Sequence, residues 1–307
     1  MREPIKTLTL TDDAPVVVLA ELPGDLQVSG SESMAVSILA DDDHGISLEL
    51  DAEGRVQVRA GGDAVLRLPA NASLEVRAVR GDARIQGIGG RLDIAEVNGD
   101  LKLRDVGPCR IGRVYGDLRA NAVNGDLAVE AVFGDAAVRA VRGTVTLDRV
   151  QADALVRDVD GTVVVSAGAD ATVELSAPGA HRLDAGADLR LIVGPAFAGT
   201  MELHGGGERR IDLPESRMRV ERLDTMTRIT VLTEGAAASD DGEADGGPGK
   251  DAAAQPLTVH AGGDYILSQP GVSSRDSRWQ ARVEFRAMGD EFRAIGDEFR
   301  QLAERVT

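Results

Sequence analysis

The sequence has a single cysteine, Cys109, in 307 residues. One thiol excludes an intramolecular disulfide framework and a zinc site built from several cysteines. Aromatic residues make up only 3% of the chain, which argues against a globular core centred on ring packing. The hydrophobic content is nevertheless 43%, so the chain has enough Val, Leu, Ala and Ile to bury a core and is not globally disordered.

The charge is one-sided, with 51 acidic residues against 34 basic ones and a net charge of −17. This charge opposes non-specific binding to nucleic acid or anionic membranes by the surface as a whole, although a local basic face remains compatible with it. Long apolar runs are also missing. The run VVVLA at residues 16–20 is too short for a signal-peptide core, and no other stretch approaches the roughly 18 apolar residues of a membrane span. We therefore expect a soluble, cytoplasmic protein that binds neither nucleic acid nor membranes.

Glycine is in excess, with 36 residues, and the glycines in the middle of the chain are periodic. They recur mostly nine residues apart, at positions 81, 90, 99, 116, 125, 134, 143 and 161. The units between them, such as GDLKLRDVG, GDLRANAVN and GDLAVEAVF, share the consensus G-D-L-x-V-x-x-V-x, and the unit at residues 108–115 is one residue short. A fixed short period is typical of repeat architectures.

Each column of the repeat has a structural interpretation. Positions 3 and 5 are apolar and two residues apart, as on one face of a β-strand. Position 8 is almost always Val or Ile and predicts a second inward side chain after a bend, while Gly and Asp at positions 1 and 2 are typical of turns. Stacked copies would pair their strands about 4.8 Å apart. We predict an all-β fold, a parallel β-solenoid with nonapeptide half-coils and about 18 residues per coil. The alternative is a meandering antiparallel sandwich.

The pattern divides the chain into four segments. Residues 1–233 are the predicted β-solenoid, with the clearest repeats at 72–165. Residues 234–255 hold six acidic residues and one lysine, a net charge of −5, which predicts a flexible acidic linker. Residues 256–270 resume strand character and are expected to add a short strand pair to the solenoid. Residues 273–307 have a different period.

The last segment has heptad spacing, which predicts an amphipathic C-terminal α-helix. The seam of this helix consists of Phe285, Met288, Phe292, Ile295, Phe299, Leu302 and Val306. Three interpretations stay open: the helix caps the solenoid, it self-associates as a coiled coil, or it binds a membrane surface. The segment holds seven Arg and seven acidic residues, so it offers no cationic face to anionic lipid and membrane binding is the weakest of the three.

The residue types that most often perform chemistry form no recognisable site. The histidines, His44, His181, His204 and His260, have no metal-ligand spacing, and Cys109 falls at an inward position, as expected of a core thiol. No nucleophile elbow, metalloprotease, phosphate-binding or dinucleotide-binding motif is present. The repeated G-D is similar to calcium-binding nonapeptides, but each unit has one Gly, which favours turn chemistry. We predict no catalytic residue, no cofactor and no metal site, although a pair of carboxylates for glycoside hydrolysis stays open.

If two units make one coil, alternate units stack on the same face. One set of units then places six cations at outward positions 4 and 6: Arg84, Lys102, Arg104, Arg119, Arg139 and Arg157. This row is a candidate basic face for a partner. Either neighbouring turn Asp residues neutralise the row, or it receives an acidic partner such as the linker or another subunit. Nucleic acid is not expected there, because no aromatic residues interleave to stack on bases.

The V-N-G-D-L repeats in EVNGDLKLRDV and AVNGDLAVEAV, which follow the segment Leu68-Pro69, resemble a bacterial β-strand-repeat family of unknown function labelled "putative adhesin". The resemblance covers about residues 60–165 and implies a right-handed β-solenoid with no known catalytic residues. The architecture is also similar, more weakly, to that of bactofilins, whose β-solenoid cores polymerise.

These features predict a non-enzymatic structural or scaffold protein, a homo-oligomer or filament that assembles through its C-terminal helix, its solenoid ends or both. An open solenoid end exposes unpaired strand edges, which favours a cap or end-to-end assembly. The first alternative is a binding module, adhesin-like or specific for a polyanion or an acidic protein, that uses the basic face. A carbohydrate-active enzyme on a β-helix is a remote alternative.

Overall fold

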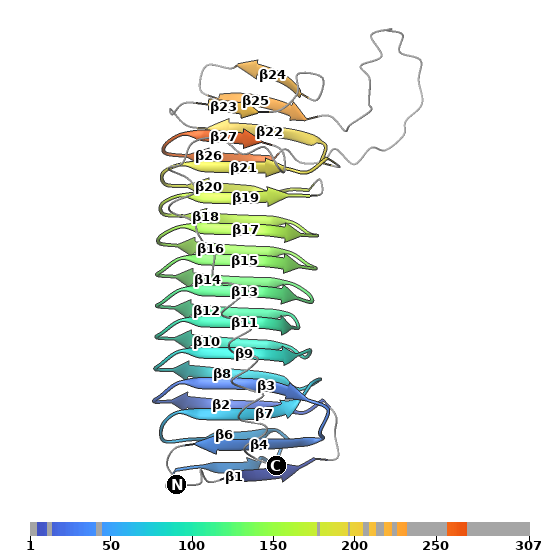
Figure 1. Ribbon diagram of the computed structural model, residues 1–307, viewed down its shortest axis with the longest axis vertical. Coiled ribbons are helices and arrows are strands. Elements are labelled where there is room, and N and C mark those ends of the chain that lie inside the picture. Colours follow the sequence, from blue (N-terminus) through green and yellow to red (C-terminus); the bar gives the residue numbers. More distant parts are fainter. Residues whose placement is uncertain are drawn as a thin grey trace, which may run out of the picture. The chain divides into compact units, whose positions relative to one another are not determined.

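The computed structural model describes residues 5–10, 14–40, 45–176, 179–195, 197–204, 209–212, 218–222, 226–231 and 257–268. These residues form an all-β body of two long sheets (Figure 1) and belong to one compact unit, residues 1–270. No helix within these ranges is long and apolar enough to cross a membrane. The linker predicted at 234–255 and the helix predicted at 273–307, with its seam Phe285, Met288, Phe292, Ile295, Phe299, Leu302 and Val306, lie outside the described residues.

The first sheet has 13 strands. They are β1 (Ile5–Thr9), β3 (Leu26–Ser31), β4 (Ala35–Ala40), β7 (Ala64–Pro69), β9 (Ala83–Ile88), β11 (Leu101–Val106), β13 (Leu118–Val123), β15 (Ala136–Val141), β17 (Ala154–Val159), β19 (Ala171–Leu175), β21 (Leu189–Val193), β23 (Arg209–Asp212) and β27 (Tyr265–Ser268).

The second sheet has 14 strands. They are β2 (Val16–Leu22), β5 (Ser47–Leu50), β6 (Val56–Arg59), β8 (Ser73–Val79), β10 (Leu92–Val97), β12 (Cys109–Val114), β14 (Leu127–Val132), β16 (Val145–Val150), β18 (Val163–Ala167), β20 (Arg182–Ala185), β22 (Gly199–His204), β24 (Met218–Arg222), β25 (Met226–Val231) and β26 (Leu257–Ala261).

Consecutive strands of the repeat region lie in opposite sheets, and each pairs in parallel with the strand two further along the chain (Figure 1). Leu92 is in register with Leu74, 18 residues earlier, and Leu101 with Leu118, 17 residues later because the unit at 108–115 is one residue short. We call two consecutive strands, one in each sheet, a rung. The spacing confirms two nonapeptides per rung and makes the body a solenoid-like stack.

The apolar columns of the repeat form the core between the sheets. In β11, Leu101, Leu103 and Val106 are fully buried, and the same three positions are buried in the neighbouring repeat strands. The bend before position 8 has a local cause in the 13-stranded sheet. Position 7 has left-handed backbone angles there, with φ of 51–69° at Gly87, Asp105, Ala122, Ala140 and Asp158. A left-handed residue reverses the strand's alternation, so the next Val or Ile points inward again.

The prediction of a parallel stack is wrong at both ends of the body. At the N-terminal end, β1, β4 and β7 pair antiparallel in one sheet, and β5 and β6 do so in the other. At the C-terminal end, β25 pairs antiparallel with both β22 and β24. At the N-terminal end, short reversals replace half-coil connections. The turn between β5 and β6, for example, closes through Gly54 at φ 77°.

The rungs at both ends are also out of chain order. The rung β2/β3 lies between β6/β7 and β8/β9. After residue 69 the chain therefore continues on the other side of β2/β3 from the rung β6/β7 that it has just formed. At the other end, segment 256–270 does carry two strands, and they form a rung between β20/β21 and β22/β23 (Figure 1). The late segment is therefore an interior layer of the stack.

Candidate functional site

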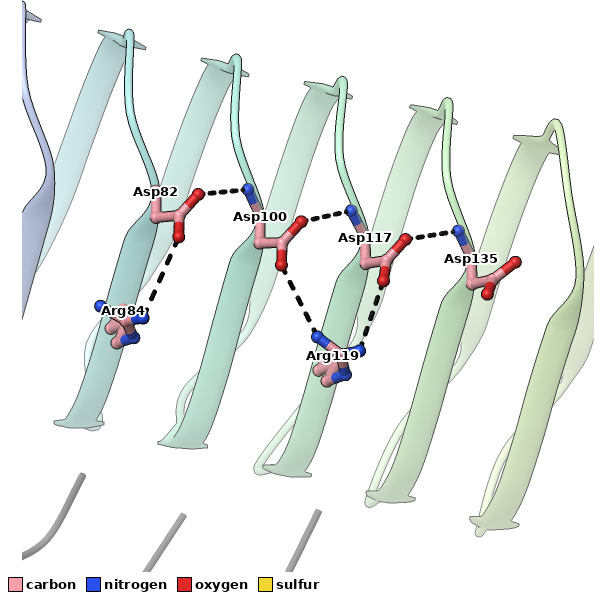
Figure 2. Close-up of polar contacts among 6 residues, drawn as sticks. All are labelled: Asp82, Arg84, Asp100, Asp117, Arg119 and Asp135. Carbon is pink, nitrogen blue, oxygen red and sulfur yellow. Dashed lines mark hydrogen bonds and ion pairs between the residues drawn. The ribbon is translucent and has the colours of Figure 1, made fainter. Parts of the chain in front are cut away.

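A ladder of aspartates crosses the 13-stranded sheet at the N-terminal ends of its strands. Each Asp lies just before a strand, and the Oδ1 of every member but the last accepts a hydrogen bond of 2.8–3.1 Å from the backbone N–H of the Asp on the next rung. Figure 2 shows four members. In spatial order the ladder is Asp63, Asp25, Asp82, Asp100, Asp117, Asp135, Asp153, Asp170, Asp188 and Asp264.

At several rungs the residue before the ladder Asp is a glycine that lies close to the carboxylate of the neighbouring rung. A Cβ on Gly116 would lie 2.4 Å from Asp100 Oδ1, and one on Gly134 would lie 2.3 Å from Asp117 Oδ1. The sequence indicated a turn role for the Asp but not a continuous ladder. Five members, Asp25, Asp63, Asp170, Asp188 and Asp264, lie outside the clearest repeats. The signal that marks them is an Asp directly before the first apolar residue of a strand.

All six residues of the predicted basic face lie on the 13-stranded sheet. Lys102 is in register with Arg84 on one side and Arg119 on the other. Arg139 is in register with Arg157, and Asn121 separates Arg139 from Arg104. The structure therefore brings the six cations together as two adjacent rows on one sheet.

Four of these cations have carboxylate partners on the same sheet, and Figure 2 shows those of Arg84 and Arg119. Arg119 bridges two members of the ladder, 3.3 Å from Asp117 and 3.7 Å from Asp100. Arg84 lies 4.0 Å from Asp82. In the other two pairs the Asp occupies position 7 of the repeat unit, where the backbone is left-handed. Arg104 Nε lies 3.5 Å from Asp105, and Arg139 Nε lies 2.9 Å from Asp158. The face is thus a mixed-charge surface, and these solvent-accessible pairs contribute little stability each.

Removing one member of the ladder tests its structural role. We expect Asp117→Ala to lower the free energy of unfolding by about 1–3 kcal/mol, because the N–H of Asp135 loses its acceptor. The control is Asp160→Ala, on an exposed carboxylate outside the ladder. Urea unfolding followed by circular dichroism measures both. Equal midpoints for the two variants would contradict a structural ladder.

The outer face of the 14-stranded sheet has a shallow groove lined by side chains of both signs, among them Arg55, Gln57, Glu75, Arg77 and Asp93. Arg55 is anchored by the turn before β6, since its Nε lies 3.0 Å from Asp51 Oδ2. Oδ1 of Asp51 accepts the backbone N–H of Arg55, and Gln57 donates to Oδ2. These hydrogen bonds, the backbone one foremost, lower the pKa of Asp51 from 3.8 to about 2.

The low pKa of Asp51 has a consequence for acid stability. The folded-state pKa is below the unfolded value, so the contribution is complete above pH 3.8 and is lost as the pH falls toward 2. We expect Asp51→Asn to remove this part of the acid sensitivity, so that the melting temperatures of variant and wild type converge in that window. Thermal melts at intervals between these pH values test this. A constant difference across the window would be the contrary result.

Cys109 is a core residue, as predicted. It is 4% exposed, its Sγ lies 3.1 Å from the carbonyl oxygen of Gly107, and burial raises its pKa to about 12. We expect iodoacetamide at pH 8 to leave the folded protein unlabelled and to label it fully in denaturant, because the thiolate is the nucleophile. Mass spectrometry reads the result without ambiguity, since the chain has one cysteine. Rapid labelling of the folded protein would mean that this rung opens.

The described histidines lie near the C-terminal end of the body. His181 is buried, and its Nδ1 accepts the backbone N–H of Val163 at 3.0 Å. The rings of His204 and His260, on the paired strands β22 and β26, stack with centroids 4.6 Å apart. Among the described residues, no group of three or more His, Cys, Asp or Glu side chains is placed to hold a metal ion. His44 lies outside them.

Comparison with known proteins identifies no family for this chain. No family model matches the chain, and no curated protein matches it. A solved structure that is similar is that of a putative cell adhesion protein from Clostridium sporogenes ATCC 15579, with 10% identity, a TM-score of 0.20, and coverage of 87% of this chain and 99% of that chain. At this score the likeness supports no argument. The resemblance to the repeat family therefore rests on the sequence motif, and the weaker one to bactofilins on the predicted architecture.

Proposed function

We propose that this protein is a non-enzymatic structural scaffold. Its body is a right-handed β-solenoid, and copies associate through the C-terminal heptad segment, the ends of the stack, or both. The observation that supports the scaffold role is the aspartate ladder, which links ten successive rungs through carboxylate-to-backbone hydrogen bonds. Such a ladder holds the rungs at a constant spacing along the stack and resists fraying between them.

Self-association is tested by comparing the full chain with a 1–272 truncation by size-exclusion chromatography and light scattering. Heptad association predicts a multiple of 32.2 kDa for the full chain and a smaller assembly for the truncation. Assembly through stack ends predicts that both proteins form multimers, which negative-stain micrographs would show as rods of varied length. Two monomeric masses would overturn the self-association part of the proposal.

A second candidate, a binding module for an acidic partner, is supported by the gathering of six cations on one sheet. The ion pairs at Arg84, Arg104, Arg119 and Arg139 weigh against it, because a partner would have to compete with carboxylates already in place. Charge reversal at Arg104, Arg119 and Arg139, assayed by salt-dependent binding of polyglutamate, tests this candidate. Unchanged binding and unchanged assembly would eliminate it.

A further inference from the structure

The rung formed by β26 and β27, residues 257–268, fills a slot between two rungs that precede it in the chain. Thr258 is in register with Arg182 on β20 and with Glu202 on β22. Tyr265 is in register with Leu189 on β21 and with Arg209 on β23. This slot therefore exists only after rungs on both sides are in place, and the last described segment of the chain closes it.

The contacts that hold this rung are of the same kind as those elsewhere in the stack. Leu257 and Val259 are fully buried, and Leu267 is nearly so. Toward β21, the N–H of Asp264 donates to Asp188 Oδ1, and the carbonyl of Asp264 accepts the N–H of Leu189, both at 2.8 Å. Toward β22, the hydroxyl of Tyr265 donates to the carbonyl of His204. None of these contacts depends on which chain supplies the segment.

The connection to this rung is much longer than its geometry requires. Val231 pairs with Gly199 on one side of β22, and Leu257 pairs with Met201 on the other. The two ends are thus separated by about two strand spacings, or ~10 Å, which three or four extended residues would span. Residues 232–256 supply 25. A chain of 25 residues spans up to roughly 80 Å when extended, enough to reach a neighbouring copy.

We propose that associated copies of this protein exchange residues 257–268, so that the slot of one copy is filled by the β26/β27 rung of another. This inference rests on the proposed self-association and names the element that joins the copies. The heptad segment begins at residue 273, five residues after Ser268. Association of two heptad segments therefore holds two copies of the rung close to two slots at a millimolar effective concentration. Exchange of an identical element then costs no contact.

Cysteine trapping tests the exchange in the full chain. Arg182→Cys and Thr258→Cys are made in separate, differently tagged chains, which are co-expressed and oxidised. Paired residues on adjacent strands lie about 5 Å apart at Cα, within the range of a disulfide. Exchange predicts a covalent heterodimer containing roughly half of the chains, the share expected for random pairing into dimers. A rung that stays in its own slot predicts no heterodimer, which would overturn the proposal.

The matched control uses Asp93→Cys and Arg110→Cys. These positions are in register on β10 and β12, which belong to two rungs that follow each other in the chain. These substitutions in one chain should give an internal disulfide, and in separate chains they should give no heterodimer. The buried Cys109 does not compete. Light scattering of the same samples separates the two proposals: multimers without a cross-chain disulfide defeat exchange alone, whereas monomers defeat exchange and self-association together.

Discussion

Replacing Leu103 with alanine is expected to lower the free energy of unfolding by about 2–5 kcal/mol. Leu103 is fully buried in the middle of the stack. Its in-register neighbours are Ile85 on one rung and the small Ala120 on the other. Two hydrogen-bonded sheets enclose the site, so they cannot collapse into the space that the lost side chain leaves, and a cavity remains.

The control for this prediction is Lys102→Ala, on the same strand but at an outward position. A surface truncation of this kind is expected to change stability by less than about 1 kcal/mol. Urea unfolding measured by circular dichroism gives both midpoints. If the two variants unfold at the same urea concentration, the loss of the Leu103 side chain does not leave a destabilising cavity.

Replacing Gly107 with alanine is expected to destabilise the protein by about 1–3 kcal/mol. Gly107 lies at the turn between β11 and β12, where a Cβ would come within 2.3 Å of the carbonyl oxygen of Gly89 and 2.4 Å of that of Gly90. Both obstacles are backbone atoms of the neighbouring rung. The rungs must therefore move apart locally, which weakens the hydrogen bond from Gly107 N–H to the carbonyl of Ile88.

Gly61→Ala is the matched substitution, because a Cβ at Gly61 meets no atom within 4 Å. It is expected to be neutral or to stabilise by about 0.4–1 kcal/mol, since alanine reduces the entropy of the unfolded chain. Melting temperatures of the two variants should therefore move in different directions or by very different amounts. Equal losses at both positions would show that close approach between rungs is not the cause.

The repeat itself could be read from the sequence because its columns are local signals. Alternation at positions 3 and 5, the Val or Ile at position 8 and the G-D turn each reflect the conformation of a few consecutive residues. The two-unit rung and the inward Cys109 followed from these columns. The left-handed backbone at Ala122 and Ala140 had no such signal, because alanine is not typical of that conformation.

The candidate basic face illustrates a different limit. The period of two units was enough to place Arg84, Lys102 and Arg119 side by side. Two of the ion pairs on this face, Arg119 with Asp100 and Arg139 with Asp158, depend on side-chain reach between rungs. The sequence pattern gives the row of each residue and offers the turn Asp residues as partners, which the structure has at Arg84 and Arg119. It does not mark Asp105 or Asp158 as a partner.

The amino-acid pattern alone therefore settles the composition of one rung: how long it is, which side chains point inward and where the chain turns. Only the tertiary structure decides the order in which rungs stack. The physical reason is that every rung presents the same alternating Val and Leu side chains and the same backbone donors and acceptors, so the local sequence does not specify its neighbours. The placement of β2/β3 and of β26/β27 between rungs distant in sequence is decided by the packing of the whole stack.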